Sequence, residues 1–269
     1  MSLTKFDFVY VVLTYRNTKD LSSFFINNTI TDSKVIVVNS FYDKSTEVEF
    51  QRISNENLAD FINVENLGYG NGNNKGVEFA INNYEFKFLI ISNPDVAIIK
   101  MDKKYLLNSP KNIIYAPKIF TLKKKNQNPY IYNFSFNIRK VFYFACIKNI
   151  TYLKYFIFFI NSVFRRIFNL LVTFSKKDFY KIYSCHGSFI IIGEEALKLL
   201  KNPFYNDMFL FNEEHFFARK AKLNKIDIRY LPHKVEVKHF EDGSTDLNNK
   251  QLKSHMSESY IKYFEYFFK

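Results

Sequence analysis

Short apolar runs separated by amphipathic stretches dominate the first third of the chain. Runs rich in Val, Ile, Leu and Phe predict buried strands, and stretches with apolar residues at helical spacing predict helices between them. The expected strands are Phe6–Thr14, Lys34–Asn39, Asp60–Val64 and Phe86–Ser92, and the expected helices are Asp20–Asn28 and Asn74–Asn83. Strands that alternate with helices predict an α/β fold, with a mostly parallel sheet covered by helices on both faces.

The last third of the chain returns to the same pattern. Its expected strands are Ser188–Ile192, Ile226–Leu231 and Lys234–His239, and its expected helices are Glu194–Leu200, Glu213–Leu223 and an amphipathic C-terminal helix over Asn249–Lys269. No internal repeat and no low-complexity linker divides these parts. We therefore expect one α/β domain over residues 1–269, and ligands of such sheets sit at the carboxyl ends of strands.

The middle of the chain, residues 129–183, is an inserted helical region dense in Phe, Tyr and Ile and studded with Lys and Arg. On a helix over Lys154–Thr173 the polar side chains fall within a sector of roughly 140°, and the remaining face is almost wholly Phe, Ile, Leu and Val. A basic amphipathic helix with a wide aromatic face is typical of an interfacial membrane anchor. The alternative is a core helix packed on the sheet. Because no run of about 18 or more apolar residues is present, we expect no membrane-spanning helix.

The net charge of +12 favours anionic partners such as lipid headgroups or phosphorylated substrates. Nucleic acid is not expected, because no recognition motif is present and the basic residues cluster with apolar surface. The two cysteines, Cys146 and Cys185, form no CxxC pair, which favours a reducing compartment. The N-terminus has no basic region before its apolar run, so we interpret that run as a first strand, not a signal peptide.

Four of the seven glycines fall in one stretch, NLGYGNGNNKG, at Asn66–Gly76. A dinucleotide fingerprint would need glycine at position 73 or 75, where the chain has Asn73 and Lys75, and no GK[ST] follows as in a P-loop. Glycine reaches positive φ at low cost, and asparagine tolerates that geometry while it forms hydrogen bonds. The stretch predicts a loop that shapes a polar ligand pocket just before a helix; the alternative is a tight turn.

Three further segments place polar groups at the ends of predicted elements. Ser92–Val96, SNPDV, delivers Asp95 at the carboxyl end of a buried strand, as a ligand for a cation or as a helix cap. Glu213 and Glu214 open a predicted helix, where they can act as a general base or simply favour the helix dipole. His239 ends a strand, and a lone histidine has a structural or a ligating role.

In this order and spacing the segments resemble the family 2 glycosyltransferases, which have the Rossmann-like GT-A nucleotide-sugar-binding fold. The likeness is closest to bacterial enzymes that build capsule and O-antigen, including rhamnosyl- and galactosyltransferases. VVLTYRN resembles the family's first strand and donor-base turn, and NLGYGNGNNKG resembles its N-x-G-[FY]-x-x-G-N-N-x-G segment. SNPDV resembles the NPD form of the DxD metal motif, and FLFNEEHFFARKAK resembles the acidic motif with the catalytic base. The resemblance covers Phe6 to Phe240 apart from the middle region.

The resemblance implies a single GT-A domain with a nucleotide-sugar-binding part at 1–128, the helical insertion at 129–183 and an acceptor and catalytic part at 184–269. It implies an inverting hexosyltransferase that uses direct displacement and a divalent cation, Mn²⁺ or Mg²⁺, which stabilises the leaving nucleotide. Asp95 and His239 correspond to the metal ligands. Glu214 is our choice for the base, and Glu213 is the close alternative.

The implied donor is a UDP- or dTDP-sugar. The implied donor-binding residues are Thr14, Tyr15, Asn39, Asn66, Gly68, Asn73, Asn74, Asn93 and Asp95. Asn39 replaces an Asp that usually accepts the uracil or thymine ring N–H, and Asn93 replaces the first Asp of DxD. These two departures favour the alternative function, a non-catalytic nucleotide- or carbohydrate-binding module of the same fold.

The aromatic and basic middle region suits a saccharide acceptor that is held at the membrane by a lipid diphosphate. The expected partners are therefore the nucleotide-sugar, a lipid-linked saccharide and an anionic membrane surface. The expected location is cytoplasmic and peripheral, at the inner face of the cell membrane. The aromatic surplus could also bury a homodimer interface between the middle helices.

Overall fold

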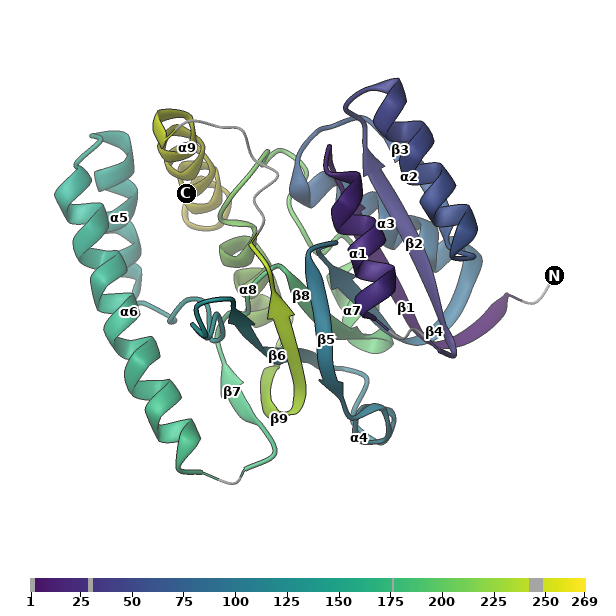
Figure 1. The fold of residues 1–269 in the computed structure, drawn as a ribbon. Helices are drawn as coiled ribbons and strands as arrows, with labels where there is room; N and C mark the ends of the chain where they lie inside the picture. The colour runs from purple at the N-terminus through teal and green to yellow at the C-terminus, as the bar shows by residue number, and fades with distance from the viewer. Residues whose placement is uncertain (1–2, 29–30, 176, 242–248) are drawn as a thin grey trace.

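The computed structural model describes residues 3–28, 31–175, 177–241 and 249–269 (Figure 1). Its strands are β1 (Thr4–Thr14), β2 (Ser33–Ser40), β3 (Asp60–Val64), β4 (Tyr84–Ser92), β5 (Val96–Met101), β6 (Ile114–Thr121), β7 (Tyr180–Ile182), β8 (Phe189–Gly193) and β9 (Ile228–His239). Its helices are α1 (Thr18–Asn27), α2 (Lys44–Glu56), α3 (Tyr69–Asn83), α4 (Lys103–Leu107), α5 (Phe136–Ile147), α6 (Thr151–Thr173), α7 (Glu194–Leu200), α8 (Glu213–Leu223) and α9 (Asn249–Phe268).

One sheet runs through the molecule in the order β3-β2-β1-β4-β8-β6-β9-β5, and β7 pairs with β9. The predicted α/β class with helices around a central sheet is confirmed. Pairing is parallel throughout from β3 to β4, but in the other half of the sheet only β6 and β9 pair in parallel; β8 lies antiparallel between β4 and β6, and β5 and β7 lie antiparallel to β9. Apolar runs predict where strands occur but not their direction, so the mixed C-terminal half was not predicted.

The two strands expected near the C-terminal end of the domain form one long strand, β9. Its register against β6 shifts at Pro117, so that residues 232–235 have no partner on β6. Pro232 lies in this irregular segment and has no N–H to donate to a neighbouring strand. Beyond the shift, the end of β9 pairs with both β6 and β5, so that His239 lies opposite Thr121 and Val96.

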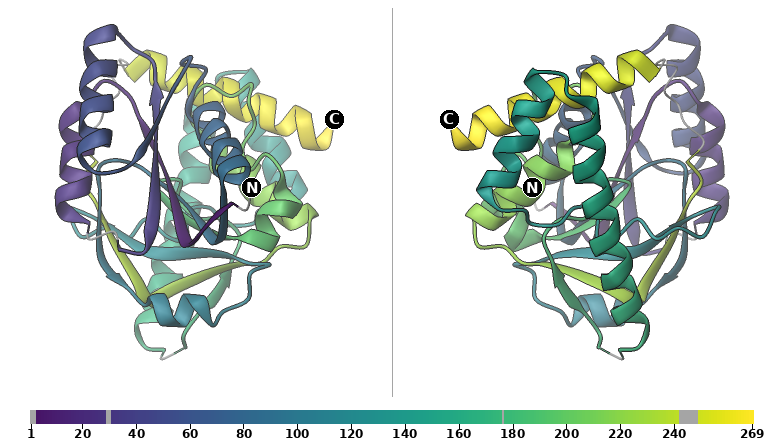
Figure 2. Two further views of the ribbon diagram at one scale, coloured as in Figure 1. Left: turned by 90° about the vertical axis from the view of Figure 1, so that its right-hand side faces the viewer. Right: turned by 90° about the vertical axis from the view of Figure 1, so that its left-hand side faces the viewer.

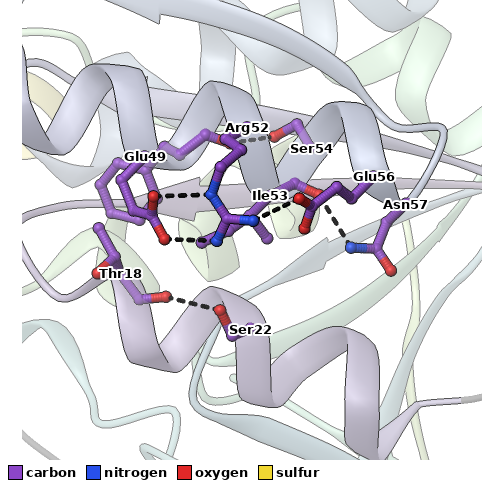
Figure 3. Close-up of polar contacts among 9 residues, drawn as sticks. Thr18, Ser22, Glu49, Arg52, Ile53, Ser54, Glu56 and Asn57 are labelled. Carbon is purple, nitrogen blue, oxygen red and sulfur yellow. Dashed lines mark hydrogen bonds and ion pairs between the residues drawn. The ribbon is translucent and has the colours of Figure 1, made fainter.

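The core has two layers, one on each face of the sheet. Side chains of α1, α2 and α4 pack against one face, and side chains of α3, α7 and α8 pack against the other (Figures 1 and 2). The outer surface of α2 is polar: the Arg52 guanidinium binds the Glu49 and Glu56 carboxylates, and on α1 the Ser22 hydroxyl donates to the Thr18 carbonyl (Figure 3). Such exposed pairs contribute little to stability.

The glycine-rich stretch is not the loop that we expected. Helix α3 begins at Tyr69, so three of its glycines lie inside the helix, and only Gly68 has a positive φ, at 101°. An added Cβ would lie 2.5 Å from Leu13 Cδ1 at Gly72 and 2.3 Å from Val11 Cγ1 at Gly76. Because these glycines have no side chains, the strand side chains fill the space where a Cβ would lie, and α3 packs close to the sheet.

Helices α5, α6 and α9 form a separate layer beside the sheet, and they share a small core with α8 that contains Phe142, Ile157, Phe216 and Tyr263. In the right-hand view of Figure 2, α5 and α6 lie side by side on the outside of the molecule. By length and composition α6 could cross a membrane, contrary to our expectation, and only 11% of its most apolar window is buried. The alternative interpretation of α6 as a core helix is therefore wrong.

Candidate active site

The two candidate metal ligands lie together where β4 and β9 end. Asp95 lies in the turn between β4 and β5, and His239 is the last residue of β9. The backbone N–H of Phe240 donates to the Asp95 carbonyl at 2.9 Å, which joins the two segments. His239 Nε2 lies 3.2 Å from Asp95 Oδ2, and the two side chains are only 9% and 12% exposed. The predicted pair is thus in contact and largely shielded from water.

Gln127 fixes the orientation of His239. Its Oε1 lies 2.9 Å from His239 Nδ1, and its Nε2 donates to Glu241 Oε1 at 2.8 Å. Because the carboxylate of Glu241 takes the amide N–H, the amide oxygen faces the imidazole, so Nδ1 carries the proton. Nε2 of the ring is then the nitrogen that faces the Asp95 carboxylate. Two electron-pair donors placed in this way fit a divalent cation between them.

Any cation at this position would need further ligands. Within the described ranges, no group of three or more His, Cys, Asp and Glu side chains is placed to hold a metal ion. Asp95 and His239 would supply two ligands, and a bound molecule or water would supply the others. Such a mixed oxygen and imidazole set, completed by oxygen ligands, suits Mg²⁺ or Mn²⁺.

His186 extends this cluster and was missed by the sequence analysis. Its ring packs edge-on against Tyr130, with centroids 5.0 Å apart, and lies 5.5 Å from the ring of His239. Its Nδ1 accepts from the Ser188 N–H at 3.1 Å. Burial, with the neighbouring His239, lowers the pKa of His186 to about 3, so the ring is neutral. The only signal in the sequence is a His-Gly pair directly before a buried strand.

The acidic pair lies at the start of α8, as predicted. Glu213 and Glu214 are its first two residues, and they follow Phe211 and Asn212, whose φ angles are 71° and 65°. The left-handed region costs a non-glycine residue about 1–3 kcal/mol when the surrounding structure imposes it. Two such residues in succession form a strained turn, and strain of this kind is typical of functional sites.

Glu213 is buried and Glu214 is half-buried. Glu214 Oε1 accepts from the Gly187 N–H at 3.2 Å, while Glu213 Oε1 is buried without a hydrogen-bond partner among the described residues. Burial, together with the neighbouring Glu214, raises the pKa of Glu213 to about 8, and burial also raises the pKa of Glu214. A carboxylate with a pKa raised toward neutrality is suited to proton transfer.

Gly187 connects the acidic pair with the metal-ligand pair. The Tyr69 hydroxyl donates to the Gly187 carbonyl at 2.8 Å, and the Gly187 N–H binds Glu214. An added Cβ at this position would lie 3.2 Å from Glu214 Oε1 and 3.4 Å from the Tyr69 hydroxyl oxygen. His186, the preceding residue, contacts His239. A continuous set of contacts therefore joins Asp95 to Glu214 through one short segment.

The expected donor-base residues lie at the carboxyl ends of β1 and β2. The Thr14 hydroxyl donates to the Val38 carbonyl at 3.1 Å, and this hydrogen bond joins the two strands. Asn39 is fully buried; its Nδ2 donates to Asn63 Oδ1 at 2.7 Å, and its own Oδ1 has no partner within the described part of the chain. An unsatisfied buried acceptor costs about 1–3 kcal/mol, so this oxygen is suited to an N–H of a ligand.

The turn after β1 carries an aromatic cluster. The rings of Tyr15 and Tyr42 meet edge to face, with centroids 5.6 Å apart, and the Arg16 guanidinium lies 4.6 Å from the centroid of Tyr42. Tyr42 was not among the predicted site residues, because nothing in its local sequence connects it to the first strand. Asn93, expected at the donor site, is held by its backbone N–H, which donates to the Ser188 carbonyl at 2.9 Å.

The asparagines of the glycine-rich stretch have mainly structural contacts. Asn66 Oδ1 accepts from the Ser40 hydroxyl at 3.0 Å and from the Gly68 N–H at 3.4 Å, which holds the approach to α3 against β2. Asn73 Nδ2 donates to the Tyr69 carbonyl at 3.0 Å, and its Oδ1 is buried without a partner in the described residues.

Asn74 anchors a distant segment to α3. Its Nδ2 donates to the Phe204 carbonyl at 2.9 Å and to Asn206 Oδ1 at 2.8 Å, and its Oδ1 accepts from the Phe204 N–H at 3.1 Å. Both amide protons are used within the protein. Its position therefore fits a structural role better than the donor contact that the sequence resemblance implies.

Two cavities differ in their relation to this site. The larger, about 1,040 Å³, lies at the amino ends of β1 and β4, away from Asp95, and its charged residues form ion pairs such as Lys5–Glu85 at 2.8 Å. The smaller, about 250 Å³, lies between α5, α6, α9 and the start of α8, where Asn212 and His215 line it. Only the smaller cavity adjoins the acidic pair.

No protein-family model matches the sequence, and no curated protein matches it. Among solved structures, the chain is similar to a crystal structure of GalNAc-T7 with UDP, GalNAc and Mn²⁺, with a TM-score of 0.63 and 12% identity over 98% of this chain and 48% of that chain. It is also similar to TarS of S. aureus, with a TM-score of 0.54 and 15% identity over 98% of this chain and 46% of that chain. Both are glycosyltransferases of GT-A type, so the predicted GT-A fold is confirmed. The chain spans about half the length of each.

Proposed function

We propose that this protein transfers a sugar from a UDP- or dTDP-sugar to a saccharide acceptor, with inversion at the anomeric carbon. The observation that carries this proposal is the set of contacts through Gly187, which joins the Asp95–His239 pair to the Glu213–Glu214 pair within a GT-A fold. One pair suits a cation beside the leaving nucleotide, and the other suits removal of a proton from the acceptor.

The leaving side of the reaction needs positive charge. Asp95 and His239 Nε2 would hold Mn²⁺ or Mg²⁺, with Gln127 keeping the imidazole in the tautomer that ligates. A divalent ion bound there would stabilise the charge that develops on the nucleoside diphosphate. GalNAc-T7 in the neighbour structure contains UDP and Mn²⁺, which supports this choice.

The attacking side needs a base, and Glu214 has the better position. In a direct displacement, the acceptor oxygen forms a bond to the anomeric carbon as the bond to the diphosphate oxygen breaks, and the hydroxyl proton passes to the carboxylate. The Gly187 N–H holds Glu214 Oε1 in place, and a hydrogen bond to the charged form keeps this carboxylate available for the proton. Burial raises the pKa of both carboxyls, so the choice of Glu214 rests on this hydrogen bond, which Glu213 Oε1 lacks among the described residues.

The base of the donor would contact Asn39. Its partnerless Oδ1 fits the ring N–H of uracil or thymine, as a neutral substitute for the carboxylate that related sequences carry. Tyr15 and Tyr42 offer aromatic surface beside this position. We extend the proposal to the acceptor and the setting: a lipid-linked saccharide in bacterial surface polysaccharide synthesis, at the cytoplasmic face of the membrane.

A thermal-shift panel of UDP, dTDP, GDP and ADP, each with Mn²⁺, Mg²⁺ or EDTA, tests the donor site first. A ligand that binds only the native state raises the unfolding midpoint by mass action. We expect a metal-dependent increase with UDP or dTDP that is lost in Asp95→Ala and retained in Arg52→Ala, a change on the remote surface of α2. No increase with any nucleotide would refute the donor site. Turnover of a labelled nucleotide-sugar that Glu214→Gln abolishes would exclude a non-catalytic binding module.

A further inference from the structure

Helix α6 is oriented with its polar side toward the protein and its apolar side outward. Asn161 binds the backbone of Tyr130 and Tyr132, at 3.1 Å and 3.0 Å, and Arg165 donates to the carbonyls of residues 126 and 127 at 3.0 Å and 2.9 Å. Large apolar side chains cover the outer side: Tyr152, Tyr155, Phe156, Phe159, Val163, Phe164, Ile167, Leu170, Leu171 and Phe174. A surface helix of a water-soluble domain has the reverse arrangement.

Helix α5 continues the same surface. Its exposed residues are Phe136, Ile138, Val141, Phe144 and Ile147, between 37% and 51% exposed. In Figure 2 the two helices lie beside each other on one side of the molecule. An exposed apolar patch of this extent marks a site for a membrane or another protein. We call these outward residues of α5 and α6 the outer apolar face.

The charge around the outer apolar face favours a membrane over a second protein as its partner. No Asp or Glu occurs between Asp102 and Asp178, whereas Lys140, Lys148 and Arg166 are exposed on or beside the outer apolar face. Two copies joined through this face would bring like charges together. An anionic bilayer supplies the opposite charge and takes up the apolar side chains.

We propose that the outer apolar face docks this protein on an anionic membrane, with α5 and α6 lying in the interface. The inward contacts of Asn161 and Arg165 hold α6 against the domain, which favours a helix that lies in the membrane surface over one that spans it. This inference does not depend on the chemistry of the active site. It places the acidic pair of α8, next to the same helical layer, close to lipid headgroups.

Flotation with vesicles tests the docking surface. The full chain is expected to float with phosphatidylglycerol–phosphatidylcholine vesicles and much less with phosphatidylcholine alone. Phe159→Glu with Leu170→Glu should weaken this binding by at least about tenfold, because two apolar side chains leave the lipid. The matched control, Ile26→Glu with Leu58→Glu, changes two residues that are 83% and 85% exposed on the N-terminal half and should bind normally.

Three results would overturn the proposal. The wild-type chain could fail to float with either vesicle. The Phe159/Leu170 variant could instead convert a wild-type dimer into a monomer in sedimentation analysis while vesicle binding is unchanged, which would identify a surface between two copies. Resistance of the bound wild type to alkaline carbonate extraction would indicate a spanning helix.

A second inference comes from Arg165, a half-buried cation without a counter-ion among the described residues. Arg165 lines the 250 Å³ cavity beside α8, and its Nε is buried without a partner among the described residues. Its guanidinium has two backbone carbonyls as acceptors, and no carboxylate pairs with it in the described ranges. Lys125 and Arg139 line the same cavity, together with the apolar side chains of Phe142 and Ile157. A partly shielded cation whose Nε has no acceptor favours the binding of a ligand anion.

We infer that this cavity binds the phosphate of an amphiphilic molecule, with the phosphate at Arg165 and the hydrocarbon along the apolar wall. This rests on the proposed function, for which the molecule is the acceptor. Asn212, which precedes the acidic pair, also lines the cavity, so a bound acceptor would lie next to the base.

Calorimetric titration with octyl phosphate, 1-octanol and inorganic phosphate tests this inference. Octyl phosphate should bind more tightly than either other probe, and Arg165→Gln should weaken it by about tenfold or more, because a charge-assisted hydrogen bond is lost. The adjacent Arg166→Gln is the matched control, since Arg166 is exposed, and should change the affinity less than about twofold. Arg165→Lys, which keeps the charge, should retain part of the affinity if Arg165→Gln fails to fold.

Equal binding of octanol and octyl phosphate, or equal losses in the Arg165 and Arg166 variants, would overturn the anion site. The nucleotide thermal-shift panel separates this failure from that of the transferase proposal. A chain that responds to UDP and metal but not to octyl phosphate keeps its donor site and loses only the acceptor cavity.

Discussion

Replacement of Glu213 by Gln is expected to stabilise the protein more strongly as the pH rises. Burial and the neighbouring Glu214 raise the pKa of Glu213 from 4.5 to about 8. A carboxyl group whose pKa is raised in the folded state makes its full contribution to the free energy of unfolding below pH 4.5. This contribution is lost as the pH rises toward 8. Glutamine has nearly the same shape and cannot ionise, so the variant does not lose stability in this way.

The size of the effect follows from the pKa difference. Each pKa unit corresponds to about 1.4 kcal/mol. The free energy of unfolding of the wild type is therefore lower by about 3 kcal/mol at pH 7, and by less than about 1 kcal/mol at pH 5, than it is at low pH. The free energy of unfolding of Glu213→Gln should therefore exceed that of the wild type by about 2 kcal/mol more at pH 7 than at pH 5. Any loss of packing with the amide adds a constant that does not depend on pH.

Urea unfolding of both proteins at about pH 5, 6 and 7 measures this difference directly. Glu85→Gln is the control, because Glu85 is half exposed and paired with Lys5 at the surface. Its difference from the wild type should change little over this range. A Glu213→Gln difference that is the same at pH 5 and pH 7 would refute the reasoning that this carboxyl is held uncharged in a dry site.

Three further predictions concern the site and its support. Glu214→Gln should lower kcat by about 10²–10⁴-fold without changing the nucleotide-induced thermal shift; unchanged turnover would exclude this carboxylate as the base. Gln127→Leu should weaken Mn²⁺ binding by about 10–100-fold in a titration followed by calorimetry, because the His239 tautomer is no longer fixed, and unaltered affinity would contradict that role. Gly76→Ala should destabilise the protein by about 1–3 kcal/mol in urea unfolding, because its Cβ would overlap Val11, whereas Ile81→Ala, at an exposed position of α3, should cost less.

The sequence predicted most elements of the fold because their signals are local. The boundaries of α8, at Glu213 and Leu223, agree with the prediction, since two acidic residues and a regular apolar spacing define that helix. The glycine-rich stretch was predicted wrongly. Glycine lowers helix propensity, and only the tertiary contact of α3 with Val11 and Leu13 shows why glycines are needed inside that helix.

The positions of candidate residues in the fold were predicted where one residue follows a strand or begins a helix. Asp95 and His239 lie at such positions, and the structure brings them into contact. His186 and Gln127 both contact His239, which lies more than 50 residues further along the chain. The Oε1 of Gln127 lies 2.9 Å from His239 Nδ1. No local sequence pattern could predict these contacts. The orientation of α6 could not be predicted from the sequence, because an amphipathic pattern does not show which side of a helix faces the protein.

The close approach of α3 to its surroundings fixes the spacing between two parts of the candidate site. The Tyr69 N–H binds the Phe209 carbonyl at 3.0 Å, and a Cβ at Gly68 would lie 2.1 Å from the same oxygen. Phe209 stands four residues before Glu213, while the other side of α3 rests on the strands that lead to Asn39. The start of α3 thus sets the spacing between the carboxyl end of β2, where Asn39 lies, and the segment that leads to Glu213. A side chain at position 68 would push these two segments apart, and under the proposed function it would lengthen the distance between donor and base without removing either.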